Sequence, residues 1–479
     1  MVSGMGAVLG QPRSPANDAP GEVAPQAELI ARFDVAGPRY TSYPTADRFV
    51  EAFGPVEFGP WLEQRASLAW RHPLSVYVHL PFCESVCYYC ACNKIVTRDR
   101  GRARAYVLDL VREIALYADG LGRREPVSQL HFGGGTPTFA DGPTLQSALD
   151  ALERAFAIAP DAERSIEVDP RTVDRQRLRE LRVQRFNRVS FGVQDFDPQV
   201  QQAVHRAQSA EHVFELTAEA RAIGFESVNV DLIYGLPRQS ASSFQGTLDT
   251  LARLRPDRVA LYGYAHLPER FKPQRRIQTQ ELPTAHQKLS MMRMAIERLA
   301  EAGYVFIGMD HFALPQDALA VAQRRGTLHR NFMGYTTQPD CDMLGLGVSA
   351  IGRMGPCYAQ NHRTIEHWAD AVRAGRLPIA RGCELSRDDM LRRSAIMAII
   401  CGARLSFAAL QNAYLVDPKL ALSDELARLR EFEDLGLVRV DPEGITVTPR
   451  GRYFARPIAM VFDRYLRSAL TRAAYSRVL

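Results

Sequence analysis

The sequence lacks the features that would direct it into a membrane or out of the cell. No apolar run reaches the roughly 18 to 20 residues that a membrane-spanning helix needs. No basic segment followed by an apolar one lies near its beginning, so a secretion signal is not indicated. A net charge of +5 on 479 residues is small, and the basic residues are scattered, which gives no reason to expect a nucleic acid as partner. We therefore expect a cytoplasmic protein without a membrane span.

Cysteine is also scarce, and its distribution is uneven. Eight cysteines in 479 residues are too few for a disulfide scaffold, yet four of them, Cys83, Cys87, Cys90 and Cys92, lie within ten residues. Because crowded thiolates repel one another, this cluster needs a metal, a disulfide or a redox pair. The pattern favours metal or redox chemistry in a reducing compartment.

From residue 74 to about 304, strand-like apolar runs alternate with helical periods. No glycine-rich dinucleotide fingerprint follows the first strand, so a Rossmann fold is not favoured. The alternation predicts an α/β fold, a partial (β/α)6 barrel of parallel strands with its site at the carboxyl ends of the strands. The expected strands are residues 74–80, 128–132, 165–168, 188–191, 227–233 and 258–262.

Polar or glycine-rich features lie at or near the ends of all six expected strands, which apolar packing alone does not explain. In chain order they are the cysteine loop 83–92, the glycine run 133–137, Glu167 and Asp169, Gln194 and Asp195, Asp231, and Tyr264-Ala265-His266.

The remaining chain divides by composition. Residues 1–27 predict a disordered tail, and 28–73 predict either a surface connector or a lid over a pocket. We expect the barrel domain over 74–310 and covering loops and helices over 311–386. A smaller, mostly helical domain follows over 387–479, with a β-hairpin formed by 437–440 and 445–448. Its helix-then-hairpin pattern resembles a winged helix, for which we favour domain packing over nucleic-acid binding.

The cysteine spacing favours one kind of metal site. Structural zinc takes paired knuckles, and no second pair accompanies this loop. Ferredoxin clusters need four thiolates at different spacings. Cys83, Cys87 and Cys90 can instead bind three irons of a 4Fe–4S cluster and leave the fourth iron open. Zinc and disulfides remain as alternatives.

These three cysteines, with Tyr89 before the third, resemble the signature of the radical S-adenosylmethionine enzymes, and Gly133-Gly134-Gly135-Thr136-Pro137 resembles their glycine-rich motif. Within that superfamily, further segments are similar to the bacterial oxygen-independent coproporphyrinogen III oxidases. The similarity runs from about Arg39 to the C-terminus. The segments that carry it are 40–44, 90–94, 192–195, 231–237 and 308–312.

The resemblance implies oxidative decarboxylation of two propionates of coproporphyrinogen III to vinyl groups, through a 5′-deoxyadenosyl radical. It also implies an electron donor such as flavodoxin or ferredoxin, an unidentified electron acceptor, and a monomer. The alternative is a haem-carrying chaperone of the same fold, a relative that lacks the Cys92 position and the 40–44 segment.

The family binds two S-adenosylmethionine molecules, and its contacts carry over residue by residue. The molecule on the cluster would contact Tyr77, Gly134, Glu167 and Ile351. The second molecule would contact Tyr89, Gly135, Thr136, Gln194, Arg206, Asp231 and Ala265. For the anionic substrate the candidates are Arg39 and Arg330, although each is equally consistent with an ordinary surface arginine.

No catalytic side chain is assigned, but the fourth thiol of the loop is testable. A ligand at Cys92 would close the open iron, so we expect Cys92 to be functionally important without being a ligand. Cys92→Ser is expected to retain full iron and sulfide and to lose turnover in an anaerobic assay. Loss of the cluster from this variant would contradict the prediction.

Overall fold

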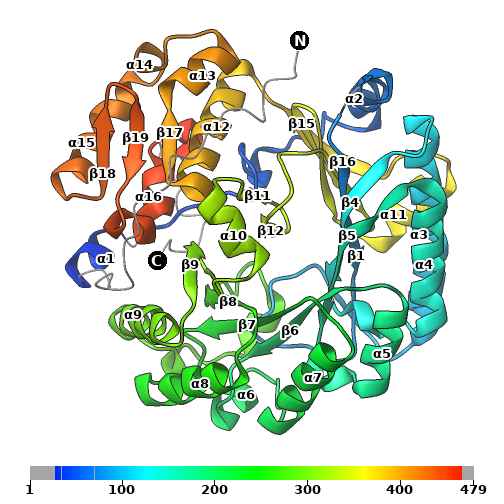
Figure 1. The fold of residues 1–479 in the computed structure, drawn as a ribbon. Coiled ribbons are helices and arrows are strands. Elements are labelled where there is room, and N and C mark those ends of the chain that lie inside the picture. Colours follow the sequence, from blue (N-terminus) through cyan, green and yellow to red (C-terminus); the bar gives the residue numbers. More distant parts are fainter. Residues whose placement is uncertain (1–26, 34, 70, 467–479) are drawn as a thin grey trace.

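A twelve-stranded sheet organises the protein, and the computed structural model describes residues 27–33, 35–69 and 71–466 around it (Figure 1). The predicted tail lies outside these residues except for Ala27, which begins α1 (Ala27–Phe33). In spatial order the strands are β16 (Ile379–Glu384), β15 (Cys357–Asn361), β14 (Ile351–Met354), β13 (Met343–Leu346), β1 (Leu74–Leu80), β4 (Pro126–Gly134), β5 (Ala157–Val168), β6 (Arg188–Gln194), β7 (Ser227–Tyr234), β8 (Arg258–Gly263), β10 (His311–Ala313) and β9 (Val305–Gly308).

The six predicted strands are confirmed as β1 and β4 to β8, which pair in parallel in chain order. β1 has the predicted bounds, and the other five extend beyond theirs. Because β1 and β8 do not pair and the sheet ends at β16 and β9, the barrel is partial, as expected.

Side chains alternate along these strands between an apolar and a polar face. Val76, Phe132 and Ile166 are fully buried in the main hydrophobic cluster, together with side chains of the helices between the strands. Their neighbours Tyr77 and His131 point to the opposite face and are only partly buried. Closed barrels of this kind fill their interior with branched apolar side chains. A polar, partly exposed inner face therefore indicates a hollow for a ligand.

Helices between the strands cover the apolar face, and most begin at a residue whose side chain caps their first turn. Asp99 accepts from Gly101 N at the start of α3, and Asp141 accepts from Thr144 N at the start of α4. The helices are α3 (Arg100–Leu121), α4 (Gly142–Ala155), α5 (Arg175–Val183), α6 (Pro198–Ala203), α7 (Ala210–Ala222), α8 (Ala241–Leu254) and α9 (Ala285–Glu301). No helix within the described ranges is long and apolar enough to cross a membrane.

The sequence predicts covering loops and helices over 311–386, but most of the secondary structure in this range is strands. β13 pairs in parallel with β1 and begins an antiparallel extension through β14, β15 and β16. These strands have four to six residues, too few for a periodic signal, and tertiary pairing stabilises them. The same region contains α10 (Ala318–Arg325), β11 (His329–Asn331), β12 (Gly334–Thr336) and α11 (Ile365–Arg373).

The C-terminal domain confirms the predicted hairpin and adds a strand. β18 (Val438–Asp441) and β19 (Gly444–Val447) pair, and β17 (Arg404–Ser406) pairs with β19 to give a three-stranded sheet. The helices here are α12 (Arg387–Gly402), α13 (Phe407–Tyr414), α14 (Pro418–Ala421), α15 (Ser423–Asp434) and α16 (Ala455–Met460).

The segment around residues 37–44 lies between this domain and the barrel, after α1 and before α2 (Pro55–Ser67). Tyr40 and Tyr43 are fully buried, and the Tyr40 hydroxyl donates to Asp463 at 3.0 Å. Arg456 donates to the Pro38 carbonyl at 2.8 Å. A surface connector, one of the two predicted roles, is therefore wrong for this segment.

Glu113 on α3 holds the β13–β15 extension against the barrel. It accepts hydrogen bonds from Gly347 N at 2.7 Å, Asn361 Nδ2 at 2.6 Å and Trp368 Nε1 at 3.0 Å. Burial raises the pKa of Glu113 from its usual 4.5 to about 7.

Stability should therefore depend on pH through this group. The folded chain keeps the Glu113 proton up to about pH 7, whereas the unfolded chain releases it near 4.5, so its contribution weakens as pH rises between those values. Glu113→Gln does not lose this contribution. Its unfolding free energy, measured by chemical denaturation, is therefore expected to rise by about 3 kcal/mol relative to that of the wild type between pH 4.5 and 7.5. Glu366→Gln at the exposed start of α11 is the control, and parallel pH profiles for wild type and Glu113→Gln would contradict the assignment.

Candidate active site

The cysteine loop leaves the end of β1 and is anchored at both ends. Cys83 closes the two-residue strand β2 (Phe82–Cys83), which pairs in parallel with β3 (Ile95–Val96). Ile95 N donates to the Pro81 carbonyl at 2.6 Å, and Thr97 N donates to the Cys83 carbonyl at 2.9 Å. The loop between these anchors carries the other three thiols of the group. The prediction that the cysteines lie at the end of the first strand is confirmed.

Two arginines point at the sulfur of Cys87. Arg206 Nη1 lies 3.2 Å from Cys87 Sγ, and Arg171 Nη2 lies 3.4 Å from it. Asp169 accepts from both guanidiniums, at 3.2 and 2.6 Å, and Arg206 Nε donates to the Gly192 carbonyl at 3.0 Å. Two guanidiniums at this distance can offset the negative charge of a sulfur that binds iron. Arg206, expected to pair a cofactor carboxylate, thus also contacts the sulfur of a predicted cluster ligand.

The other thiols have different surroundings. A hydrogen bond from the Cys92 thiol lowers the pKa of Cys90 to about 6; burial opposes this shift and the charge of Lys94 adds to it. Burial raises the pKa of Cys83 to about 11, although Thr136 Oγ1 donates to its sulfur at 3.6 Å. The raised pKa of Cys83 opposes its thiolate, but the donors at Cys83 and Cys87 can offset the negative charge of sulfurs bound to a cluster.

The thiols do not fit the zinc alternative. In the described part of the chain, no group of three or more His, Cys, Asp and Glu side chains is arranged to hold a single metal ion. A zinc ion requires its ligands to converge on one point, whereas in a cluster each thiolate binds its own iron.

The glycine run lies against the start of the cysteine loop at very close range. A Cβ on Gly135 would lie 2.7 Å from the Phe82 carbonyl oxygen, and one on Gly134 would lie 2.6 Å from the His79 ring. Gly134 also has a φ of 114°, which L side chains rarely adopt. A Cβ on Gly133 would meet the Glu167 carboxylate at 2.8 Å. These three contacts explain the run physically, because an added side chain would meet the Glu167 carboxylate, the His79 ring or the backbone that leads into the loop.

Glu167 and its neighbours form a polar group on the inner face. Its carboxylate accepts from His131 Nε2 at 3.2 Å and from Gly134 N at 3.1 Å. Burial opposes ionisation, but these hydrogen bonds outweigh it and lower the pKa of Glu167. Tyr77 stacks on His131 with ring centroids 5.8 Å apart and shares a 3.0 Å hydrogen bond with His79. The Glu167 side chain is 41% exposed and therefore accessible to a ligand.

Asp231 is the second carboxylate of the inner face, two strands from Glu167. It accepts from Asn229 Nδ2 at 2.8 Å and from Ser190 Oγ at 3.3 Å. Burial, followed by the charge of Glu167, raises the pKa of Asp231 to about 7. The two carboxylates can accept hydrogen bonds from ribose hydroxyls or an ammonium group.

Gln274 connects two predicted contacts that lie far apart in the sequence. Its Nε2 donates to the Tyr89 carbonyl at 3.0 Å and to the Ala265 carbonyl at 3.2 Å. Gln194 ends β6 with a φ of 73°, beside Gly192. Ile351 begins β14, next to Gly345, the register partner of Tyr77. The predicted cofactor residues therefore lie on the inner face or on the segments around it, and their roles stay predictions.

Sequence reasoning missed the supporting side chains. His79, His131, Ser190, Asn229 and Gln274 were not singled out. For the first four, the signal was available: each occupies an inner-face position between apolar neighbours on a strand.

Comparisons with known proteins agree with this geometry. The family model of the radical SAM superfamily matches residues 77–251, and that of the HemN C-terminal domain matches residues 385–454. With three thiols and a glycine run at the ends of parallel strands, the protein is a radical S-adenosylmethionine enzyme. Its cofactors are a 4Fe–4S cluster and S-adenosylmethionine.

Full-length relatives define the family more narrowly. The oxygen-independent coproporphyrinogen III oxidase of Pseudomonas aeruginosa is 48% identical over 455 residues, which are 95% of this chain and 98% of the relative. That of Escherichia coli is 47% identical over 451 residues, 94% of this chain and 98% of the relative. The solved structure of the Escherichia coli coproporphyrinogen III oxidase, described as a radical SAM enzyme, is 46% identical and has a TM-score of 0.88. The match covers 93% of this chain and 100% of the solved chain. The chain belongs to the oxygen-independent coproporphyrinogen III oxidase family.

The close approach of the glycine run is testable by adding one methyl group. Gly135→Ala must displace the backbone that leads into Cys83, so iron and sulfide per chain are expected to fall and S-adenosylmethionine to bind at least about tenfold more weakly. Gly246→Ala in α8, where nothing lies within 4 Å of the added carbon, is the matched control. Cofactor content and binding equal to wild type in Gly135→Ala would contradict this account.

Proposed function

We propose that this protein decarboxylates two propionates of coproporphyrinogen III to the vinyl groups of protoporphyrinogen IX without oxygen. The proposal is supported above all by the 48% identity to a coproporphyrinogen III oxidase over nearly the full length of both chains. The β-hydrogen of a propionate is not acidic, so a general base cannot remove it. When bound, the cluster and S-adenosylmethionine supply a 5′-deoxyadenosyl radical that can abstract such a hydrogen.

The side chains of this protein prepare the cofactor site. Cys83, Cys87 and Cys90 would hold the cluster, and Arg206 and Arg171 would offset the negative charge of its thiolates. We assign only these three cysteines to the four irons of the cluster. The fourth iron would then be open to S-adenosylmethionine.

The cofactor itself would be bound by the inner face. Glu167, kept ionised by His131 and Gly134, would accept hydrogen bonds from one S-adenosylmethionine molecule, together with Tyr77, Gly134 and Ile351. A second molecule would lie between Asp231 and the end of the cysteine loop. Its contacts would be Tyr89, Gly135, Thr136, Gln194, Arg206, Asp231 and Ala265.

The remaining parts of the proposal concern partners. The reaction removes electrons from the substrate, so it requires an acceptor. The cluster must be reduced, so it requires a donor such as flavodoxin or ferredoxin. We propose that the protein works as a cytoplasmic monomer.

Anaerobic turnover tests the function directly. Reconstituted protein incubated with coproporphyrinogen III, S-adenosylmethionine and a reductant is expected to yield protoporphyrinogen IX and methionine, measured by chromatography. A variant with Ser at positions 83, 87 and 90 is the control and should give neither product. Tight haem binding with no vinyl product from the wild type would contradict the proposal and favour a haem-carrying chaperone.

A further inference from the structure

Two arginines 291 positions apart in the sequence meet at the open side of the barrel. Arg330 Nε donates to the carbonyl of Arg39 at 3.3 Å. The Arg39 guanidinium pairs with Asp310 at 3.1 Å and lies over the ring of Tyr262, 5.1 Å from its centroid. That of Arg330 lies 4.7 Å from the centroid of Tyr335. Each cation is therefore positioned by an aromatic ring as well as by hydrogen bonds.

This cluster belongs to the same polar face as the proposed cofactor site. Asp231 pairs in register with Ala260 on β8, and Ala260 pairs with His311 on β10. Strands are about 4.8 Å apart, which places His311 roughly 10 Å from Asp231 along one row. The intervening Ala260 is small. A ligand of tetrapyrrole size at Asp231 would reach the arginines.

The cluster carries more positive than negative charge. The guanidiniums of Arg39, Arg330 and Arg456 surround one carboxylate, that of Asp310, and together they help to lower its pKa although burial opposes this. Burial, followed by the charge of Arg330, lowers the pKa of His311 to about 3, so this ring is neutral. Burying unbalanced charge is unfavourable unless a counter-charge is present.

Two buried nitrogen atoms of the cluster also lack partners. Within the described residues, neither Arg330 Nη1 nor His311 Nδ1 has a hydrogen-bond partner. Arg330 itself is 6% exposed, and native proteins leave few such groups unsatisfied. The Arg39 side chain is 32% exposed and so remains accessible. The combination is typical of a site whose hydrogen bonds are completed by an anion.

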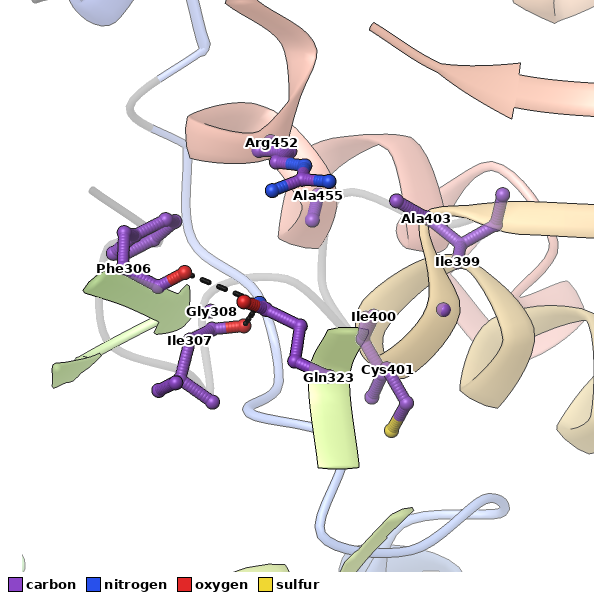
Figure 2. Close-up of a pocket in the computed structure, with 11 residues that line it drawn as sticks. Phe306, Ile307, Gly308, Gln323, Ile399, Ile400, Cys401, Ala403, Arg452 and Ala455 are labelled. Carbon is purple, nitrogen blue, oxygen red and sulfur yellow. Dashed lines mark hydrogen bonds between the residues drawn. The ribbon is translucent and has the colours of Figure 1, made fainter. Parts of the chain in front are cut away.

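Side-chain hydrogen bonds hold β9, the strand that pairs with the His311 strand β10, as a preformed site requires. Gln323 Nε2 donates to the Phe306 carbonyl at 3.1 Å and to the Ile307 carbonyl at 2.6 Å, beside the cavity between β9 and α12 (Figure 2). The Tyr335 hydroxyl donates to the Ile400 carbonyl at 3.0 Å on the same side.

We propose that Arg39 and Arg330 bind one propionate carboxylate of the tetrapyrrole substrate, with His311 Nδ1 as a third hydrogen-bonding group. This rests on the proposed function. Planar guanidiniums suit a carboxylate, and a propionate held here would orient the ring so that another propionate faces the cofactor. The three residues position the substrate and do not take part in the radical step.

Binding of coproporphyrin III, a fluorescent oxidised form of the ring, tests the proposal in the reconstituted protein with S-adenosylmethionine bound. Arg39→Gln and Arg330→Gln are each expected to raise the Kd of coproporphyrin III by about tenfold or more. Binding of the uncharged coproporphyrin III tetramethyl ester should change by less than about twofold, and Arg330→Lys should recover part of the loss. The matched control is Arg177→Gln, since Arg177 also pairs with a carboxylate, Glu180, and a carbonyl, that of Ala140, but on α5.

The outcomes separate this site from the proposed function. Equal weakening of acid and ester, or unchanged binding of the acid in Arg39→Gln, would overturn the site even if the wild type makes vinyl product. A charge-specific loss of binding in a wild type that makes no vinyl product would support the site and contradict the function. S-adenosylmethionine cleavage without substrate should match wild type in both variants, which shows that the cofactor site is intact.

Discussion

The alternation of side chains along the parallel strands is the constraint on which the rest of the structure depends. One face of each strand must be apolar because helices cover it, and Val76, Phe132 and Ile166 are accordingly fully buried. The other face is free of that requirement and carries Tyr77, His131, Glu167 and Asp231. A shift of one residue in any strand would exchange the two faces. The same register therefore stabilises the domain and builds the site.

The charges on that inner side are sorted by position. Arginines contact Cys87 at the cysteine loop, carboxylates occupy the middle of the face, and arginines recur at Arg39 and Arg330. This order matches the charges of the molecules in the proposed reaction. A thiolate-bound cluster is electron-rich, S-adenosylmethionine carries a sulfonium and an ammonium group, and the substrate bears four carboxylates. In the proposed reaction, electrostatic complementarity of this kind would order the three along the inner face.

Much of this arrangement could be predicted from the sequence, and the reason for each failure is physical. β1 was predicted with its observed bounds because a β-branched, apolar run of seven residues ends at Pro81. The recurrence of polar and glycine-rich features at strand ends predicted where the site lies, whereas the individual cofactor contacts came from the resemblance to the oxidase family and stay predictions. β13 was missed because four residues, one of them glycine, form a strand only by pairing with β1. The meeting of Arg39 with Arg330 and the contact of Arg206 with Cys87 depend on tertiary structure, which no local pattern encodes.

The central claim is that three thiolates hold a 4Fe–4S cluster whose fourth iron accepts S-adenosylmethionine. Electron–nuclear double resonance on the reduced, reconstituted protein tests it most directly, with S-adenosylmethionine labelled with ¹⁵N and ¹⁷O in its methionine amino and carboxylate groups. The account predicts hyperfine coupling of both labels to the cluster. A cluster spectrum that shows no coupling and does not change on addition of the labelled cofactor would contradict it.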